Sequence, residues 1–600
     1  MRKQTKIVAV ASAAALLAIG ASMTSFAATG WVEEDGQWYF YDKDGNRVED
    51  EWKKSGDNWY WLDSEEGGAM AVDKLVEDDD DTYYVDANGV MVKNTWVKVV
   101  NEDQDEDDDP AEYRYYYMQS NGKAYTAPDD GETSFKTIDG KRYAFDEDGK
   151  MLYGWVKAED ATLATDESEW EDCTYYLGSW EDGAMKTGWQ KITVYDSEED
   201  EDMDYWFNFK SNGKIRKSVN EKKLNGKYYR FDSRGVMVYE WALASGGNTA
   251  SVSDWSYFRS PEDGARVTKG WFKVVAPDDD NDNTFADYEG SFTIGKDNDA
   301  AEENERWYYA DGDGELYEGQ IKKIKGKYYG FYPEGTTKAG SMLTGLCALI
   351  TKGDEIVEVI ARNMDADDLD DCMDGKGNFA VMYGDDLDEG CTASLYYFGN
   401  DEDNDGSLKT GATTVSLDGD SYSFYFNKSG GAESKGKGLT GIDDGKYIYK
   451  FGLKMKADSD DKYKVVYATG DTGEDDAVVE EIDTAKLRKL AKEAEGKNKD
   501  DETVKFVGTL GDDYYLVNTS GAIVKNKTAA KDGDDWYFYV DEKHIKMYTN
   551  NKTLGVDSGD ADLEDIKGIG LKDNWDDENT VITSQETEIK LADIMDRTVE

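Results

Sequence analysis

The stretch GWVEEDGQWYFYDKDGNRVED (30–50) is followed directly by EWKKSGDNWYWLDSEEGGAMAVD (51–73), and the second segment repeats the plan of the first. Trp31 returns as Trp52 and Trp38 returns as Trp59, in both cases after 21 residues. Self-similarity at a short fixed period indicates small units that cannot bury their apolar faces alone and must stack on their neighbours. We therefore expect the function of this chain to lie in its stacked units.

Each unit is predicted to be a β-hairpin. The aromatic run 38–41 is bounded by Gly36 before it and by the turn-forming segment 42–45 after it, which suits a strand that enters a tight turn. Side chains alternate between the two faces of a strand, so consecutive aromatic residues populate both faces of the hairpin. One face can then pack on the next unit while the other stays partly open. An isolated hairpin is marginal in water, so stacking is needed for stability.

The order Gly-Trp, polar residues, Gly, an aromatic run, Asp-x-x-Gly and then Met resembles the choline-binding, or cell wall-binding, repeat of Gram-positive surface proteins. Residues 51–70 match it most closely. The resemblance implies that the hairpins stack into a left-handed β-solenoid. It also implies that aromatic residues of adjacent repeats, often with a methionine, enclose the trimethylammonium group of phosphocholine on teichoic acids. Cation–π attraction of this kind contributes roughly 0.5 to 2 kcal/mol for each ring.

The motif recurs along much of the chain. First-strand positions are Trp31, Trp52, Leu75, Trp96, Trp155, Trp189, Trp241 and Trp271, and the aromatic second strand recurs up to Tyr328-Tyr329. Methionines stand two residues after five turn glycines, at Met70, Met91, Met151, Met185 and Met237. Such a regular placement predicts a packing position for methionine.

By resemblance, the candidate ligand-binding residues form three groups. They are Trp31 and Trp38 with Tyr60; Trp52 and Trp59 with Tyr84 and Met70; and Trp155 and Tyr175 with Trp189, Trp206 and Met185. The alternative for each ring is that it only builds the solenoid core. Several departures from the family pattern predict few complete sites, concentrated before Met342: Leu75 stands in place of a tryptophan, and the units at Tyr228 and Tyr328 lack a first-strand tryptophan.

The predicted fold class is all-β: a solenoid of hairpin repeats with acidic loop insertions, one short helix and an acidic C-terminal tail. Its segments are a signal peptide (1–27), an aromatic hairpin array (28–343), a divergent insertion (344–395), degenerate repeats interrupted by a helix near 484–495 (396–548), and an acidic segment (549–600). The helix is expected because Leu487, Leu490, Ala491 and Ala494 have helical spacing behind Thr484.

Composition and the N-terminus restrict the partners. Arg2, Lys3 and Lys6 precede an apolar run and a small-x-small site at Ser25–Ala27, a pattern typical of a secretion signal. Removing these three basic residues changes the net charge from -61 to -64, which excludes nucleic acid as a plausible partner. We expect a secreted, wall-associated protein with no membrane span after signal removal, bound to teichoic acid phosphocholine or to a wall or host glycan.

The sequence also contains two weaker candidate sites. Asp278, Asp280, Asp282 and Glu289 occupy ligand positions of a calcium loop, but Asn283 replaces the required glycine, so calcium is only a possible cofactor. The loop Asp401-x-Asp403-x-Asp405 is a similar case. In a secreted protein, the last three of Cys173, Cys347, Cys372 and Cys391 could include one disulfide.

Catalytic chemistry has little support in the sequence. The chain has one histidine, His544, and no evident partners for a triad or a metal site. The sequence therefore predicts a non-catalytic, secreted cell wall-binding protein that attaches non-covalently through aromatic cages. Two alternatives stay open: a wall-associated glycoside hydrolase or amidase with an unrecognised catalytic segment, and a glucan-binding adhesin.

Overall fold

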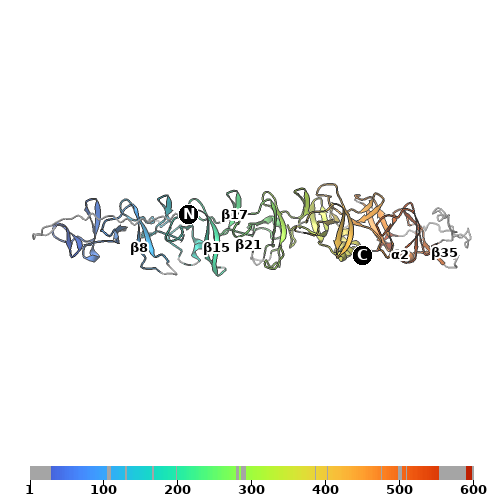
Figure 1. Ribbon diagram of the computed structural model, residues 1–600, viewed down its shortest axis with the longest axis horizontal. Helices are drawn as coiled ribbons and strands as arrows, with labels where there is room; N and C mark the ends of the chain where they lie inside the picture. Colours follow the sequence, from blue (N-terminus) through green and yellow to red (C-terminus); the bar gives the residue numbers. More distant parts are fainter. Residues whose placement is uncertain are drawn as a thin grey trace. The chain divides into compact units, whose positions relative to one another are not determined.

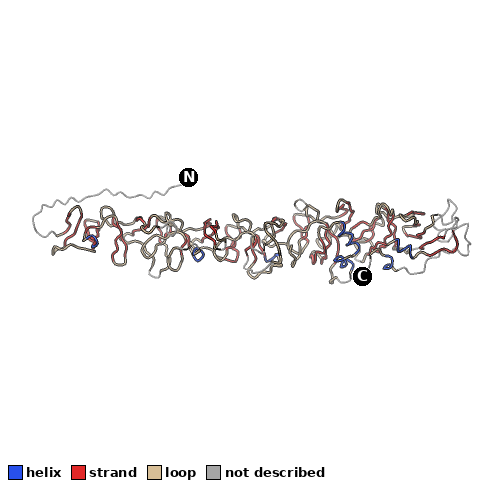
Figure 2. The backbone as a smooth tube through the Cα atoms, turned by 90° about the horizontal axis from the view of Figure 1, so that it is seen from below, coloured by secondary structure: helices blue, strands red, loops and turns tan. Residues whose placement is uncertain are grey.

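The computed structural model describes residues 29–552 and 590–597, except for 105–109, 129–130, 165, 167, 198, 279–282, 286–291, 385–386, 402, 404, 475, 498–502 and 509. The signal peptide and most of the acidic C-terminal segment predicted from the sequence therefore lie outside the described residues. Two compact units are present: 1–239 with 259–265, and 240–258 with 266–600. Strands and loops make up nearly all of the described backbone, which confirms the all-β prediction (Figure 2).

The first unit is a series of short antiparallel hairpins, several of which are visible around the labels β8, β15 and β17 in Figure 1. Apart from one five-stranded sheet of β1 to β5, each sheet has two strands. The strands of this unit are β1 Gly30–Glu34, β2 Gln37–Tyr41, β3 Glu51–Ser55, β4 Asn58–Asp63, β5 Ala69–Met70, β6 Lys74–Asp78, β7 Asp81–Val85, β8 Thr95–Val100, β9 Tyr113–Met118, β10 Lys136–Ile138, β11 Lys141–Tyr143, β12 Trp155–Val156, β13 Tyr175–Tyr176, β14 Gly188–Asp196, β15 Glu201–Phe209, β16 Ser218–Leu224 and β17 Lys227–Phe231.

The second unit begins with small sheets of the same kind and continues into larger ones. Its first strands are β18 Trp241–Leu243, β19 Trp255–Tyr257, β20 Gly270–Val274, β21 Thr284–Phe285, β22 Arg306–Ala310, β23 Ile321–Ile324, β24 Lys327–Gly330, β25 Leu346–Lys352, β26 Glu355–Ala361 and β27 Thr392–Tyr397. A five-stranded sheet follows, with β28 Gly411–Leu417, β29 Asp420–Phe426, β30 Gly441–Asp443, β31 Tyr447–Lys450 and β32 Leu453–Lys454. The last sheet has eight strands: β33 Tyr463–Thr469, β34 Val478–Ile482, β35 Lys492–Lys497, β36 Thr503–Val507, β37 Tyr514–Asn518, β38 Lys527–Lys531, β39 Tyr537–Asp541 and β40 His544–Thr549.

A recurring backbone hydrogen bond joins many of the hairpins to the one before. Shortly after the second strand of a hairpin, one residue donates its N–H to a carbonyl in or beside the second strand of the preceding hairpin. The pairs are Met91 to Trp59, Ala124 to Thr82, Met151 to Tyr115, Met185 to Arg142, Ile215 to Thr174 and Met237 to Trp206 in the first unit, and Met342 to Trp307 and Leu408 to Tyr328 in the second. This repeated bond fixes the register between neighbouring hairpins.

The methionine position is a packing position, as the spacing predicted. The turn glycine of the next hairpin lies directly against the methionine, so that a Cβ at Gly122 would overlap Met91 and a Cβ at Gly213 would overlap Met185. These glycines also have positive φ, 93° and 85°, which side chains rarely adopt. Glycine is therefore needed at this position for two reasons, the backbone conformation and the close approach of the methionine.

Three expectations are corrected by the structure. The predicted helix 484–495 is shorter: α2 covers Thr484–Lys489, with Asp483 rather than Thr484 as its N-cap, and it ends there because the chain continues into β35, which pairs with β36. A second helix, α1 (Ala366–Asp374), forms in the 344–395 segment behind a capping box of Asp365 and Asp368, and a short α4 (Leu591–Ile594) lies near the C-terminus. No disulfide joins the four cysteines, and three of them are buried thiols.

Candidate ligand cages

The first-strand tryptophan of each array hairpin packs edge-on against an aromatic ring of the following hairpin. Ring centroids lie 4.8 to 5.3 Å apart and the interplanar angles are 60° to 75°. The pairs are Trp31–Tyr60, Trp52–Tyr83, Trp96–Tyr143, Trp155–Phe207 and Trp189–Tyr229 in the first unit, and Trp241–Tyr308 and Trp271–Tyr329 in the second. Edge-to-face contact at this separation is the favoured geometry for aromatic pairs. We call this first-strand tryptophan the inner ring.

At some junctions a second aromatic ring, from the second strand of the same hairpin, lies on the same face as the inner ring. Strand register places Trp59 opposite Lys54 and Trp61 opposite Trp52, so Trp52 and Trp59 share one face. The same relation holds for Trp189 with Trp206, whose centroids are 6.4 Å apart at 81°, and for Trp271 with Trp307, at 6.2 Å and 86°. We call this second-strand residue the outer ring.

Four cages among the described residues contain an inner ring, an outer ring, and a tyrosine and a methionine from the next hairpin. The outer-ring carbonyl accepts the methionine N–H in each, which holds the four side chains in a constant arrangement. They are the Trp52 cage (Trp52, Trp59, Tyr83, Met91), the Trp96 cage (Trp96, Tyr115, Tyr143, Met151), the Trp189 cage (Trp189, Trp206, Tyr229, Met237) and the Trp271 cage (Trp271, Trp307, Tyr329, Met342).

The cages are partly open to solvent. All of their inner and outer rings are half-buried, whereas the tyrosines Tyr83, Tyr143 and Tyr229 are only 8 to 9% exposed. The tyrosines therefore anchor the junction, while the inner and outer rings keep accessible surface. Half-exposed aromatic rings with a thioether beside them can bind a cation or the CH face of a sugar.

A lysine stands opposite the outer ring in all four cages. The cross-strand pairs are Lys54 with Trp59, Lys98 with Tyr115, Lys191 with Trp206 and Lys273 with Trp307. Lys54 Nζ lies 5.9 Å and Lys273 Nζ 6.0 Å from the centroid of the opposing ring, so these rings already attract a cation of the chain itself. The sequence signal for these lysines is Trp-x-Lys, which is present in all four cage hairpins.

In two cages a carboxylate from a distant segment bridges this lysine and the outer ring. Glu262 accepts from Lys191 Nζ (2.8 Å) and from Trp206 Nε1 (3.1 Å). Asp403 accepts from Lys273 Nζ (2.7 Å) and from Trp307 Nε1 (3.1 Å). Hydrogen bonds from the lysine and the indole hold the pKa of each carboxyl below its ordinary value. Each of these two cages therefore has a negative charge next to its outer ring.

Comparison with known proteins identifies the repeat. Residues 28–74 match the family model described as a choline-binding repeat. This segment carries a choline-binding repeat. A search of curated protein sequences finds no match.

Among solved structures, three Streptococcus pneumoniae proteins are similar to this chain. The modular autolysin LytC is 18% identical over 54% of this chain and 55% of its own length, with a TM-score of 0.28. The alignment thus spans about half of the autolysin. CbpJ is 20% identical over 52% of this chain and 94% of its own (TM-score 0.29), and choline binding protein F is 20% identical over 53% and 100% (TM-score 0.27).

The structure regroups the residues that the sequence proposed for choline binding. Trp31 and Tyr60 do meet, at 5.3 Å, and Trp38 lies on the same face as Trp31. For Trp52 and Trp59, however, the facing residues are Tyr83 and Met91 instead of Tyr84 and Met70. Tyr84 points to the opposite face and donates to Asp73 at 2.5 Å. Met70 belongs to the first junction, because Ala69 before it pairs with Tyr39 after Trp38.

The third proposed group divides between separate hairpin junctions. Trp155 faces Phe207, while Tyr175 lies on the other face of its hairpin against Phe135, at 4.9 Å. Met185 packs in the cluster around Tyr175. Trp189 and Trp206 are brought together, but their partners are Tyr229 and Met237.

The candidate calcium loop is only partly described. Asp280, Asp282 and Glu289 lie outside the described residues. Asp278 is 1% exposed, and its carboxylate accepts from the Ala300 N–H at 2.6 Å. In the second loop, Asp405 pairs with Lys409 and Asp403 with Lys273. The described part of the chain contains no group of three His, Cys, Asp or Glu side chains arranged to hold a metal ion. None of the helices that the structure describes is long and apolar enough to cross a membrane.

Proposed function

We propose that this chain is a secreted, non-catalytic protein that attaches to the cell envelope by binding choline groups of teichoic acid in its ring cages. The observation that carries the proposal is the repeated set of inner ring, outer ring, tyrosine and methionine at four junctions. Each set presents half-buried, polarizable ring faces, which suit a quaternary ammonium ion better than a smaller hydrated cation. Several weak sites on one chain add avidity on a polymer that carries many choline groups.

Three of the four cysteines are poor candidates for a catalytic nucleophile. Burial raises the pKa of the Cys173, Cys347 and Cys372 thiols to about 12, so they are protonated and unreactive at neutral pH. His544, the single histidine, lies 3.9 Å from Asp512, an exposed carboxylate. Neither arrangement provides an activated nucleophile.

Retention on choline resin with elution by free choline tests the proposal. We expect Trp307→Ala to weaken binding at the Trp271 cage about tenfold, because a ring contact contributes roughly 1 to 2 kcal/mol when partly desolvated. Trp307→Tyr, which keeps a ring, should restore much of it. Tyr328→Ala is the matched control, since Tyr328 holds the outer-ring position in a hairpin whose first strand, β23, contains no tryptophan.

Three outcomes would contradict the proposal. Elution by wall glycan but not by choline would make the rings a sugar platform, as in the glucan-binding alternative. Release of reducing ends or peptides from purified walls would reveal a hydrolase or amidase. Retention that a chelator abolishes and that ring substitutions leave unchanged would indicate calcium-dependent attachment.

A further inference from the structure

A cavity of about 740 Å³ adjoins the Trp271 cage and shares two of its residues. Trp307 and Met342 line both the cage and the cavity, and Lys273 stands at their common edge. A ligand that occupies the cage and extends past Trp307 and Met342 would reach this cavity.

The charge of the cavity is opposite to that of the chain. Four cationic side chains line it, Lys273, Arg306, Lys338 and Arg362, against the two carboxylates Glu303 and Glu305. The whole chain has 130 acidic and 69 basic residues, so acidic residues outnumber basic ones nearly two to one. In the cavity lining this ratio is reversed. Such a concentration of positive charge in a concave site attracts anions.

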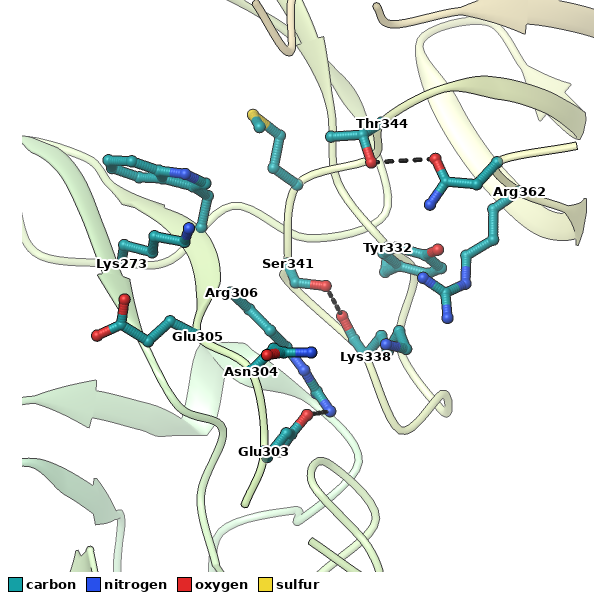
Figure 3. Close-up of a pocket in the computed structure, with 13 residues that line it drawn as sticks. Lys273, Glu303, Asn304, Glu305, Arg306, Tyr332, Lys338, Ser341, Thr344 and Arg362 are labelled. Carbon is teal, nitrogen blue, oxygen red and sulfur yellow. Dashed lines mark hydrogen bonds and ion pairs between the residues drawn. The ribbon is translucent and has the colours of Figure 1, made fainter. Parts of the chain in front are cut away.

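The individual contacts show which cations can receive a ligand. Lys273 already pairs with Asp403 at 2.7 Å, so it is not one of them. Arg306 is anchored by Glu303 and by the Thr337 carbonyl, to which it donates at 2.8 Å, so it forms part of the wall. Arg362 is exposed, and its guanidinium lies 5.9 Å from the centroid of Tyr332. Figure 3 shows Lys338 and Arg362 on one side of the cavity and Lys273 with Glu305 on the other.

Hydrogen-bonding groups complete the lining. Ser341, Thr344 and Asn363 contribute hydroxyl and amide groups, and Thr344 Oγ1 donates to Asn363 Oδ1 at 3.2 Å, which leaves the Asn363 amide N–H₂ as a donor. Arginine, lysine, hydroxyl and amide donors together are the usual partners of a phosphate oxygen.

A second cage has a related neighbour. A cavity of about 480 Å³ lies beside Trp189 and is lined by Arg216 and Lys223 with no carboxylate. Cation-lined cavities thus occur beside two of the four cages of an otherwise strongly acidic chain.

We propose that the cavity beside the Trp271 cage binds the phosphate group of the same phosphocholine whose trimethylammonium group occupies the cage, with Arg362 and Lys338 as its principal ligands. This proposal rests on the choline-binding function proposed above. It assigns to this junction a zwitterionic ligand, in which the aromatic rings recognise the cation and the basic cavity recognises the phosphate.

Calorimetric titration of the full chain with choline, phosphocholine and inorganic phosphate tests this. We expect one site to bind phosphocholine about tenfold more tightly than choline, the gain given by charge-assisted hydrogen bonds to a phosphate. The double variant Arg362→Gln, Lys338→Gln should remove this difference and leave choline affinity unchanged. The double variant Lys323→Gln, Lys352→Gln, an equal charge change at two exposed strand positions in the same unit, should have no effect.

The outcomes separate this inference from the proposed function. Absence of choline binding to the unmodified chain would refute the proposed function. Normal choline binding with no preference for phosphocholine, or with a preference that survives the double variant, would overturn only the phosphate site. Inorganic phosphate bound as tightly as phosphocholine and insensitive to Trp307→Ala would show an independent anion site and would also overturn the proposal.

Discussion

The hairpins around Trp189 and the eight-stranded sheet β33 to β40 are both built from short strands. They differ in how many strands are hydrogen-bonded into one sheet. In the first unit, β14–β15 and β16–β17 are separate two-stranded sheets, joined through side chains and the Met237 to Trp206 hydrogen bond. Near the C-terminus, β33 to β40 share one eight-stranded sheet with a mainly aliphatic core. Separate hairpins leave half-buried rings at their junctions, whereas fused strands bring the apolar residues into a closed core.

The C-terminal region also contains an ion pair whose two partners are both buried, whereas the buried Asp196 of β14 pairs with the half-buried Arg234. Lys450 and Glu480 are 3% and 4% exposed, and Glu480 receives 2.9 Å and 2.6 Å contacts from Lys450 and from Arg597 near the C-terminus. Burial lowers the pKa of the Lys450 ammonium. We therefore predict that the buried contacts of the C-terminal sheet contribute most to the free energy of unfolding. We predict that the half-buried rings between array hairpins contribute most to ligand binding.

The largest effect is expected for Glu480→Gln. Removing the carboxylate leaves Lys450 buried without its counter-charge, which should lower the free energy of unfolding of the second unit by about 3 to 5 kcal/mol. Chemical denaturation with hydrogen exchange would locate the loss. Glu358→Gln, the same change on an exposed strand position, is the control. Loss of choline retention at the Trp189 cage in Glu480→Gln would contradict the separation of the two roles.

The next effect concerns the contact between a turn glycine and methionine. Gly213→Ala must accommodate a Cβ that overlaps Met185, in addition to an unfavourable φ of 85°. We expect a loss of about 2 to 4 kcal/mol from overpacking and backbone strain together. Gly226→Ala has a similar φ, 87°, and nothing within 4 Å, so it should lose only about 1 kcal/mol. Equal losses in the two variants, measured by denaturation, would remove the packing argument.

A smaller effect is expected at Asp146, a turn carboxylate in the array. Burial raises its pKa to about 6, although it accepts from the Lys150 N–H at 2.7 Å. Since the folded state then binds more protons than the unfolded state between pH 4 and 6, stability should fall by roughly 2 kcal/mol as pH rises through this range. Asp146→Asn should abolish this dependence and stabilise the protein at pH 7.

Asp42 provides the matched control for Asp146. Backbone hydrogen bonds from its own turn lower the pKa of Asp42, so Asp42→Asn should not stabilise the protein at neutral pH. Asn518 already holds the equivalent position in the C-terminal sheet, where it accepts from the Ser520 and Ala522 N–H groups. Denaturation curves at pH 4, 6 and 8 would distinguish the two aspartates; identical profiles would contradict the burial explanation.

The smallest effects are expected at the carboxylate of the Trp189 cage. Glu262→Gln should weaken choline binding about two- to fivefold and Lys191→Gln should strengthen it by a similar factor, since exposed charges contribute only modestly. Both effects should shrink at high salt. Because the pKa of Glu262 is lowered, its contribution should persist until pH falls below the ordinary range of a glutamate. Changes of the same sign in both variants, measured by titration, would contradict this role.

The sequence predicted the hairpins, the turn glycines and the methionine position well because each depends on local spacing. Local spacing was misleading at Thr484–Glu495, where the helical spacing of apolar residues predicted a longer helix than the structure contains. There Asp483 caps the helix and the chain pairs as β35 with β36, a tertiary contact that spacing does not report. Three proposed calcium ligands and the signal peptide lie outside the described residues.

By itself, the sequence determined that this protein is built from aromatic hairpins and which tryptophans are repeated. Only the tertiary structure decided that Tyr83 and Met91, not Tyr84 and Met70, face Trp52 and Trp59, since a shift of one residue reverses the face of a strand. It also brought Glu262 to Trp206 across 56 positions and Asp403 to Lys273 across 130. Repetition along the chain encodes each hairpin, but the membership of a cage depends on register and on distant segments, which no local pattern records.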